Sequence, residues 1–327
     1  SLNAYPIYIE VNNGTDLTKL APAFELTEGA SIEPASGSTQ NFTYPVRYTV
    51  TSEDKNWHRT YAIHIHYPET KSIPTVFNFE NAKTVPYNKN EYYVLYEAAT
   101  GYSTLTWSSG NQGFALTGSG YTPNDFPTGI SPNGRTGNCV QLITRQTGSL
   151  GAMVGMPIAA GNLFIGSFDI SSAMKDALSA TRFGTTFYYE PIKLEGYYKY
   201  KAGPQFYEKG EYTDKKDVFN IYALFYEKTK DVQMLDGHIT KNNYEHENMV
   251  AVAVITDAHE TDEWTHFELA FDYDRFQKKV DPQKLANGGY NISIILSASK
   301  DGDVFQGAPG STLLIDDLEL VYKQPLR

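Results

Sequence analysis

The chain has 327 residues, of which 41% are hydrophobic and 20% charged, a composition typical of a globular protein long enough for two domains. Its formal net charge of −11 argues against nucleic acid as a partner, because binding to phosphates requires a basic surface. The single cysteine, Cys139, excludes an internal disulfide, and its apolar neighbours predict a small buried side chain. The sequence contains no run of about 18 apolar residues that would predict a membrane-spanning helix.

Residues 1–68 are predicted to form a small β domain. Residues 46–52 and 57–67 alternate apolar and polar side chains with the period of a strand, and the polar residues between them predict a hairpin turn. Upstream, residues 23–27 predict a short strand, and the Pro-, Gly- and Ser-rich residues 32–42 predict loops of the kind found in sandwiches.

Residues 75–327 are predicted to form a second, larger domain, which the proline-containing linker 69–74 separates from the first. Gly-, Pro- and Asn-rich loops join its strand candidates, and only residues 171–180 have a helical pattern. The strand candidates are residues 75–80, 139–145, 163–170, 183–189, 217–227, 249–256, 264–271, 291–299 and 312–322. The fold class is therefore all-β, with a two-sheet sandwich in the larger domain.

No familiar catalytic motif occurs in the sequence, neither a nucleophile elbow, a zinc-binding helix nor a phosphate-binding loop. Glycoside hydrolysis needs only two carboxylates across a sugar-binding cleft, and such a pair has no fixed spacing in the sequence. Glu190 and Glu195 flank a tyrosine-rich stretch and are the first pair to test. No residue is assigned as catalytic.

Carboxylates near the two ends of the larger domain suggest a calcium site. Glu80 lies on its first predicted strand and Asp316 and Asp317 on its last, and the first and last strands of such folds often run side by side. Asp301 and Asp303 form a fragment of a calcium loop or a plain turn. No cofactor is required by the sequence; a structural calcium at Glu80 and Asp316 is a hypothesis, with solvated carboxylates as the alternative.

The segment EGYYKYKAGPQFYEKGEY, residues 195–212, combines tyrosines with lysines and glutamates. Sugars stack their C–H faces on flat rings while their hydroxyls bond to polar side chains, and tyrosine offers both a ring and a wet hydroxyl. Strand alternation places Tyr198 and Tyr200 on one side and Tyr197, Lys199 and Lys201 on the other. The alternative is that the tyrosines border a hydrophobic core.

A second ring, Trp107, lies in the polar, Gly-containing segment TWSSGNQGF together with Asn111. This composition predicts a binding loop. Trp57 and Trp264 lie in regularly alternating strands and are predicted to be core residues.

Several separated segments resemble a known family. TWSSGNQGF, GNLFIGSF (161–168), FGTTFYYEPIKLEGYYKYKAGP (183–204) and SASKDGDVFQGAPGSTLLIDDLELVY (297–322) resemble the putative carbohydrate metabolism domain of glycan-degrading gut bacteria. The likeness extends over nearly all of residues 75–327. Residues 20–65 resemble the small immunoglobulin-like domain that often precedes it.

The resemblance implies an N-terminal Ig-like sandwich followed by a larger, carbohydrate-binding-like β-jelly roll. It also implies a cell-surface or periplasmic location, with a lipid anchor on a removed N-terminal segment. On the matching motifs, the recurring polar and aromatic positions are Trp107, Asn111, Tyr197, Tyr198, Lys199, Tyr200 and Lys201. The resemblance carries no established catalytic residues.

The sequence therefore predicts a secreted or surface-tethered protein that binds an oligo- or polysaccharide without catalysis and takes part in carbohydrate metabolism, its small domain acting as a spacer. Two alternatives remain open. One is a glycoside hydrolase with a carboxylate pair, and the other is an adhesion or assembly protein that contacts a protein partner through the Ig-like domain.

Overall fold

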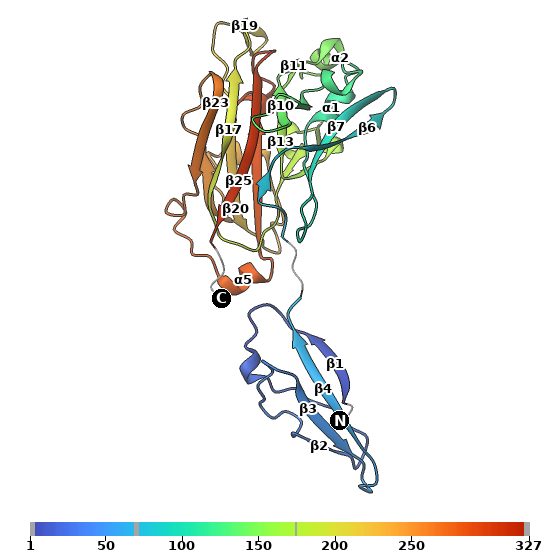
Figure 1. Cartoon of the computed structure of the whole chain (residues 1–327). Coiled ribbons are helices and arrows are strands. Elements are labelled where there is room, and N and C mark those ends of the chain that lie inside the picture. Colours follow the sequence, from blue (N-terminus) through green and yellow to red (C-terminus); the bar gives the residue numbers. More distant parts are fainter. Residues whose placement is uncertain (1–3, 69–71, 174, 324–327) are drawn as a thin grey trace. The chain divides into compact units, whose positions relative to one another are not determined.

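The computed structural model of the chain describes residues 4–68, 72–173 and 175–323 (Figure 1). The chain divides into two compact units, Ser1–Thr70 and Lys71–Arg327, called here the small unit and the large unit. Residues 69–71 of the predicted linker lie outside the described residues. No helix among the described residues is long and apolar enough to cross a membrane.

The described strands of the small unit form one sheet in the order β1-β4-β3-β2, in which β1 and β4 run parallel. Its elements are β1 (Tyr5–Glu10), the 3-10 helix η1 (Leu17–Lys19), β2 (Ser31–Glu33), β3 (Val46–Thr51) and β4 (His58–His66). The predicted hairpin is β3 and β4.

The core of the small unit differs from that of a two-sheet sandwich. Its buried side chains Phe42, Tyr48 and Ile63 are covered by Leu17, Leu20 and Phe24. The last three lie in η1 and in the extended segment that follows it, where no strand forms, so the strand predicted over residues 23–27 is absent and no second sheet of described strands covers this core.

A six-stranded sheet forms one layer of the large unit, in the order β23-β17-β25-β10-β9 with β5 paired to β25. The long strands β17, β23 and β25 lie side by side in Figure 1. Their bounds are β5 (Val76–Phe77), β9 (Thr128–Ser131), β10 (Cys139–Ile143), β17 (Pro191–Lys201), β23 (Thr261–Ala270) and β25 (Thr312–Tyr322).

A five-stranded sheet forms the second layer, in the order β13-β24-β20-β22 with β16 paired to β24. Its strands are β13 (Asn162–Phe164), β16 (Thr185–Thr186), β20 (Asn220–Glu227), β22 (Met249–Val254) and β24 (Tyr290–Ser297). Side chains of both sheets, such as Leu194 and Ile315 from one and Ala223 and Ile294 from the other, share one core. The predicted all-β class is confirmed.

The five-stranded sheet is buried on both faces. Ile221 and Phe225 of β20 point into the core between the sheets, whereas Tyr222 and Leu224 belong to a second apolar cluster on the opposite face. A layer covers that face, made of β14 (Gly166–Phe168), α3 (Ile170–Ala173), α4 (Ala177–Ala180), β15 (Thr181–Phe183), β21 (Leu235–Asp236) and η3 (Gly237–Thr240). The helix predicted over residues 171–180 is thus two single turns.

The remaining elements include a separate three-stranded sheet in the order β6-β7-β8, and the others are short. They are β6 (Asn81–Tyr87), β7 (Asn90–Glu97), β8 (Leu105–Thr106), α1 (Asn111–Ala115), η2 (Pro123–Asp125), β11 (Arg145–Gln146), α2 (Gly148–Met153), β12 (Ile158–Ala159), β18 (Phe206–Glu208), β19 (Glu211–Thr213), α5 (Pro282–Ala286) and η4 (Gly302–Val304). Cys139 is buried, as predicted, and burial raises the pKa of its thiol to about 12.

Candidate functional site

Strand β17 carries five of the seven predicted ligand-binding residues and divides them between its two faces. Tyr198 and Tyr200 point inward and are only 2% exposed. Both rings pack on Phe219, at centroid distances of 4.7 and 4.9 Å, and the Tyr200 hydroxyl donates a hydrogen bond to the carbonyl oxygen of Ala298. The prediction that these two rings bind sugar is therefore wrong, because they fill the core between the sheets.

Trp107 and Asn111 are also buried, contrary to the prediction of a binding loop. Trp107 contacts Phe77 and Phe79, with ring centroids 5.2 and 5.8 Å apart. The side-chain amide of Asn111 accepts a hydrogen bond from the Thr128 N–H at 3.0 Å and donates one to the Thr128 carbonyl at 2.8 Å. The polar segment is therefore a structural tie that joins α1 to β9.

The other three predicted residues lie on the outer face of the six-stranded sheet. Tyr197 and Lys199 are half-buried there, and Lys201 is exposed. Their neighbours on β23 are Trp264 and His266, also outside the core. We call the outward side chains of β17 and β23, from Lys193 to Lys201 and from Trp264 to Glu268, the open face.

The aromatic residues of the open face lie next to cations. The Tyr197 and His266 rings, paired across the strands, are 5.1 Å apart. The ammonium group of Lys199 lies 5.4 Å from the ring centre of Trp264. The interpretation of Trp264 as a core residue is wrong: in WTHFELAF the inward positions are Phe267 and Leu269, so the alternating tryptophan faces outward.

Arg135, which the sequence reading did not single out, closes one side of the open face. Its guanidinium carbon lies 3.8 Å from the ring centre of Tyr197, and its Nη1 is 2.6 Å from an oxygen of Asp317. Both groups are at the surface, and a charged donor stacked on a ring is a common polar partner for a ligand.

Backbone N–H groups of the loop that carries Arg135 donate hydrogen bonds to the carboxylates of the predicted calcium site. The N–H of Asn138 donates to both oxygens of Glu80, at 3.1 and 3.2 Å, and the N–H of Thr136 donates to Asp316 at 2.9 Å. Calcium requires six to eight oxygen ligands. In the described part of the chain no group of three or more acidic, histidine or cysteine side chains is placed to hold a metal ion, so these residues do not fit a calcium site.

The second calcium candidate is also engaged in protein contacts. Asp303 accepts hydrogen bonds from Lys241 at 3.0 Å and from the Thr240 hydroxyl at 2.8 Å. Asp301 lies 3.7 Å from the ammonium group of Lys215. The plain turn, the alternative reading of this segment, accounts for these contacts.

Glu190 and Glu195, the predicted first pair to test for catalysis, form ion pairs with different lysines. Glu190 precedes β17 and pairs with Lys323 at 2.5 Å, whereas Glu195 pairs with Lys193 at 3.0 Å. Five residues of extended chain span roughly 16 Å, and even inverting hydrolases separate their carboxylates by no more than about 9.5 Å. Glu190 and Glu195 are each held by a different lysine, and the structure gives no support for this pair.

Strand register instead aligns three glutamates on the open face. Glu195 pairs with Glu268 of β23 on one side and with Glu319 of β25 on the other. Lys193 lies between Glu195 and Glu268, at 3.0 and 2.8 Å, and its hydrogen bond lowers the pKa of Glu268. A general acid needs the opposite shift, a raised pKa.

A carboxyl group with a raised pKa lies in the interior. Burial raises the pKa of Glu97 to about 7, and its Oε1 accepts a hydrogen bond from the Phe79 N–H at 3.0 Å. The residue is 6% exposed and belongs to β7, not to β17 or β23. Its contacts are those of a buried structural group.

Known proteins with similar sequences and structures carry carbohydrate-related descriptions. Residues 78–321 match the family described as putative carbohydrate metabolism domain, and residues 3–65 match the family described as SGBP, N-terminal. No curated protein matches the chain.

Two solved structures from Bacteroides are similar over most of the chain. One, from Bacteroides vulgatus ATCC 8482, is 87% identical with a TM-score of 0.77, and the match covers 78% of this chain and 100% of that one. The other, from Bacteroides thetaiotaomicron VPI-5482, is 46% identical with a TM-score of 0.72, and the match covers 98% and 91%. Both are described as putative glycoside hydrolases. Since the first family match covers most of its length, this chain belongs to the putative carbohydrate metabolism domain family.

Proposed function

We propose that the large unit binds an oligo- or polysaccharide on the open face, without catalysis. The observation that carries the proposal is the register of β17 and β23, which brings Tyr197 and Lys199 beside Trp264 and His266. Membership of a carbohydrate-related family supports the ligand class.

The open face has the chemistry that a sugar requires. Tyrosine and tryptophan rings offer flat apolar surfaces for C–H groups, and Lys193, Glu195 and Lys199 supply donors and acceptors for hydroxyls. The charged ends of Lys199 and Arg135 lie over the rings, on long side chains that can turn to bond with a bound sugar. Because few hydrogen bonds would offset the desolvation of the sugar hydroxyls, we expect dissociation constants on the order of micromolar to millimolar.

Two alanine variants test the proposal in glycan-array and calorimetric binding assays with the full chain. Trp264→Ala and Tyr197→Ala remove the rings, and each is expected to weaken saccharide binding about tenfold, the effect of losing one stacked aromatic contact. Trp57→Ala is the matched control, because Trp57 is an exposed tryptophan of the small unit with Arg59 over its ring. Equal losses in all three variants, or none in the first two, would contradict the proposal.

Glycoside hydrolysis is a second candidate function, favoured by the alignment of Glu195 with Glu268 and Glu319. The test is release of reducing ends from a panel of glycans. Turnover by the wild type that disappears in Glu195→Gln, and survives in Glu190→Gln, would establish catalysis at the open face and refute binding alone.

The small unit is proposed to act as a spacer that holds the large unit away from the cell surface or in the periplasm, on a lipid-anchored chain. The separation of the chain into two compact units supports this division of roles. The alternative, adhesion to a protein partner, predicts that residues 1–68 alone retain that partner in a pull-down experiment.

A further inference from the structure

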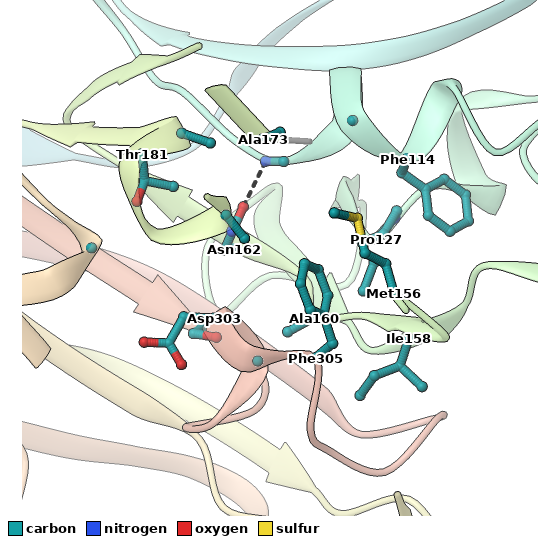
Figure 2. Close-up of a pocket in the computed structure, with 18 of the residues that line it drawn as sticks. Phe114, Pro127, Met156, Ile158, Ala160, Asn162, Ala173, Thr181, Asp303 and Phe305 are labelled. Atoms are coloured by element: carbon teal, nitrogen blue, oxygen red, sulfur yellow. Dashed lines mark hydrogen bonds between the residues drawn. The ribbon is translucent and has the colours of Figure 1, made fainter. Parts of the chain in front are cut away.

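The layer that covers the outer side of the five-stranded sheet leaves a pocket of about 540 Å³ (Figure 2). This volume lies within the range of roughly 300–1,000 Å³ that is usual for small-molecule sites. Phe164 and Tyr222 of the sheet form part of its wall, and residues from α1, α2, α3 and α4 complete it. The pocket is therefore on a different sheet from the open face.

The pocket wall is mostly apolar, and its polar groups lie to one side. Figure 2 shows Phe114, Met156 and Ile158 on one side of the pocket, and Thr181 and Asp303 across from them. A ligand that fits this arrangement has an apolar body with a polar end.

Asn162 on the polar side offers a donor to a ligand. Asn162 Oδ1 accepts the Gly110 N–H at 2.7 Å, and no residue in the described ranges accepts a hydrogen bond from Asn162 Nδ2. The carboxylate of Asp303 is already bonded to Lys241 and Thr240. Lys300 also lines the pocket, but it is exposed, so water solvates its charge. The enclosed part of this side therefore suits an uncharged ligand with a hydrogen-bond acceptor.

The pocket mouth is bordered by exposed apolar side chains. Leu150 is 52% exposed, Met153 is 75% exposed and Leu116 is 46% exposed, and all three line the pocket. Leu150 and Met153 belong to α2, and Leu116 follows α1. A ligand in the pocket would shield these groups from water, which favours an apolar occupant.

We propose that this pocket binds an uncharged aromatic molecule of two or three rings with a single carbonyl-type acceptor directed at Asn162 Nδ2. An apolar cavity of about 150 Å³ holds one benzene ring, so the larger pocket holds a few. A saccharide fits poorly, because each hydroxyl buried without a partner costs about 1–3 kcal/mol. The site is independent of the saccharide site proposed for the open face.

The test uses the full chain and the uncharged naphthyl ketone prodan, whose fluorescence shifts to the blue in apolar surroundings. We expect a saturable shift with one probe per chain. The double variant Leu150→Ser/Met153→Ser alters two side chains that are at least half exposed, and it should weaken binding at least about fivefold through lost apolar contact. Ile192→Ser, at an exposed isoleucine outside the pocket, is the control and should bind as the wild type does.

A second variant, Ala177→Phe, places a ring in the pocket and should abolish the shift while the protein stays folded, as judged by thermal melting. If it unfolds, the double variant decides the outcome. Unsaturable binding, or equal binding by the double variant and the control, would overturn the proposal. So would a wild-type dimer in size-exclusion chromatography that Leu150→Ser/Met153→Ser dissociates, because the mouth would then be an interface between copies. Saccharide that binds the open face should not displace prodan.

Discussion

The outer faces of the two sheets of the large unit differ in their exposure to solvent. Strands β17 and β23 alternate apolar and polar residues, so the outer face of their sheet stays open. Strands β20, β22 and β24 are apolar almost throughout, and their outer face needs a further layer to cover it. That covering layer is made of short helices and strands that fill space incompletely, and a pocket remains.

Tyrosines on the two faces of strand β17 have different roles. Tyr197 faces water beside Arg135 and His266, and Tyr198 and Tyr200 fill the core. Polar side chains on the open face are available to a ligand, whereas buried polar groups hold the fold together. Four predictions test this division.

The largest effect is expected from removing an inward ring. Tyr200→Ala should lower the free energy of unfolding by about 3–5 kcal/mol, since it leaves a cavity in the core, and Tyr197→Ala by less than about 1 kcal/mol. Urea denaturation measures both. Tyr200→Phe, which removes only the hydrogen bond to Ala298, should cost about 1 kcal/mol. Similar losses for Tyr197→Ala and Tyr200→Ala would break the comparison.

Removing a buried carboxylate should lower the free energy of unfolding more than removing an exposed one. Asp217 is 3% exposed and accepts hydrogen bonds from the Ser299 and Ser311 hydroxyls and the Ala308 N–H. Asp217→Ala leaves these donors without their acceptor and should cost about 2–4 kcal/mol. The exposed carboxylate Glu319 provides the matched control, since Glu319→Ala should change stability by less than about 0.5 kcal/mol.

The raised pKa of Glu97 should make the free energy of unfolding depend on pH. The folded protein holds the Glu97 proton up to a pKa of about 7, whereas the unfolded chain releases it near 4.5. The stabilising contribution is therefore complete below about pH 4.5 and is lost as the pH rises to 7, by about 3 kcal/mol. Glu97→Gln keeps an acceptor for the Phe79 N–H and should remove this loss, as measured by urea denaturation at pH 5 and pH 8. Parallel pH profiles for the two proteins would contradict the assignment.

The smallest effect on the free energy of unfolding is expected from removing the ion pair between Arg135 and Asp317. Arg135 and Asp317 are both partly exposed, so Arg135→Ala should lower the free energy of unfolding by no more than about 1 kcal/mol. High salt should reduce the difference from the wild type. A loss above about 2 kcal/mol would show that Arg135 supports the buried side of the sheet as well.

Much of the fold follows from the sequence, and much of the candidate site does not. The alternation in residues 195–201 correctly separates Tyr198 and Tyr200 from Tyr197, Lys199 and Lys201. The alternation of residues 264–271 contains the same information for Trp264, whose face is set by Phe267 and Leu269. Attention to those two apolar residues would have placed the tryptophan outside.

Polar composition proved a poor guide to exposure in the segment around Trp107. Asn111 is surrounded by serines and glycines in the sequence, yet its amide bonds to the backbone of Thr128 in the interior. The residues around Asn111 do not show that the backbone of Thr128, 17 positions later, will lie beside it and need hydrogen-bond partners. Such ties depend on which strands become neighbours.

The all-β class, the alternating strands and the sets of side chains that share a face follow from the amino-acid pattern, because these depend on a period of two residues along one strand. Which face meets another sheet, the position of Tyr197 beside His266 and that of Glu195 between Glu268 and Glu319 follow only from the packing of the folded chain. Those contacts join residues about 70 to 120 positions apart, and their register is fixed by packing of whole sheets and not by any local pattern.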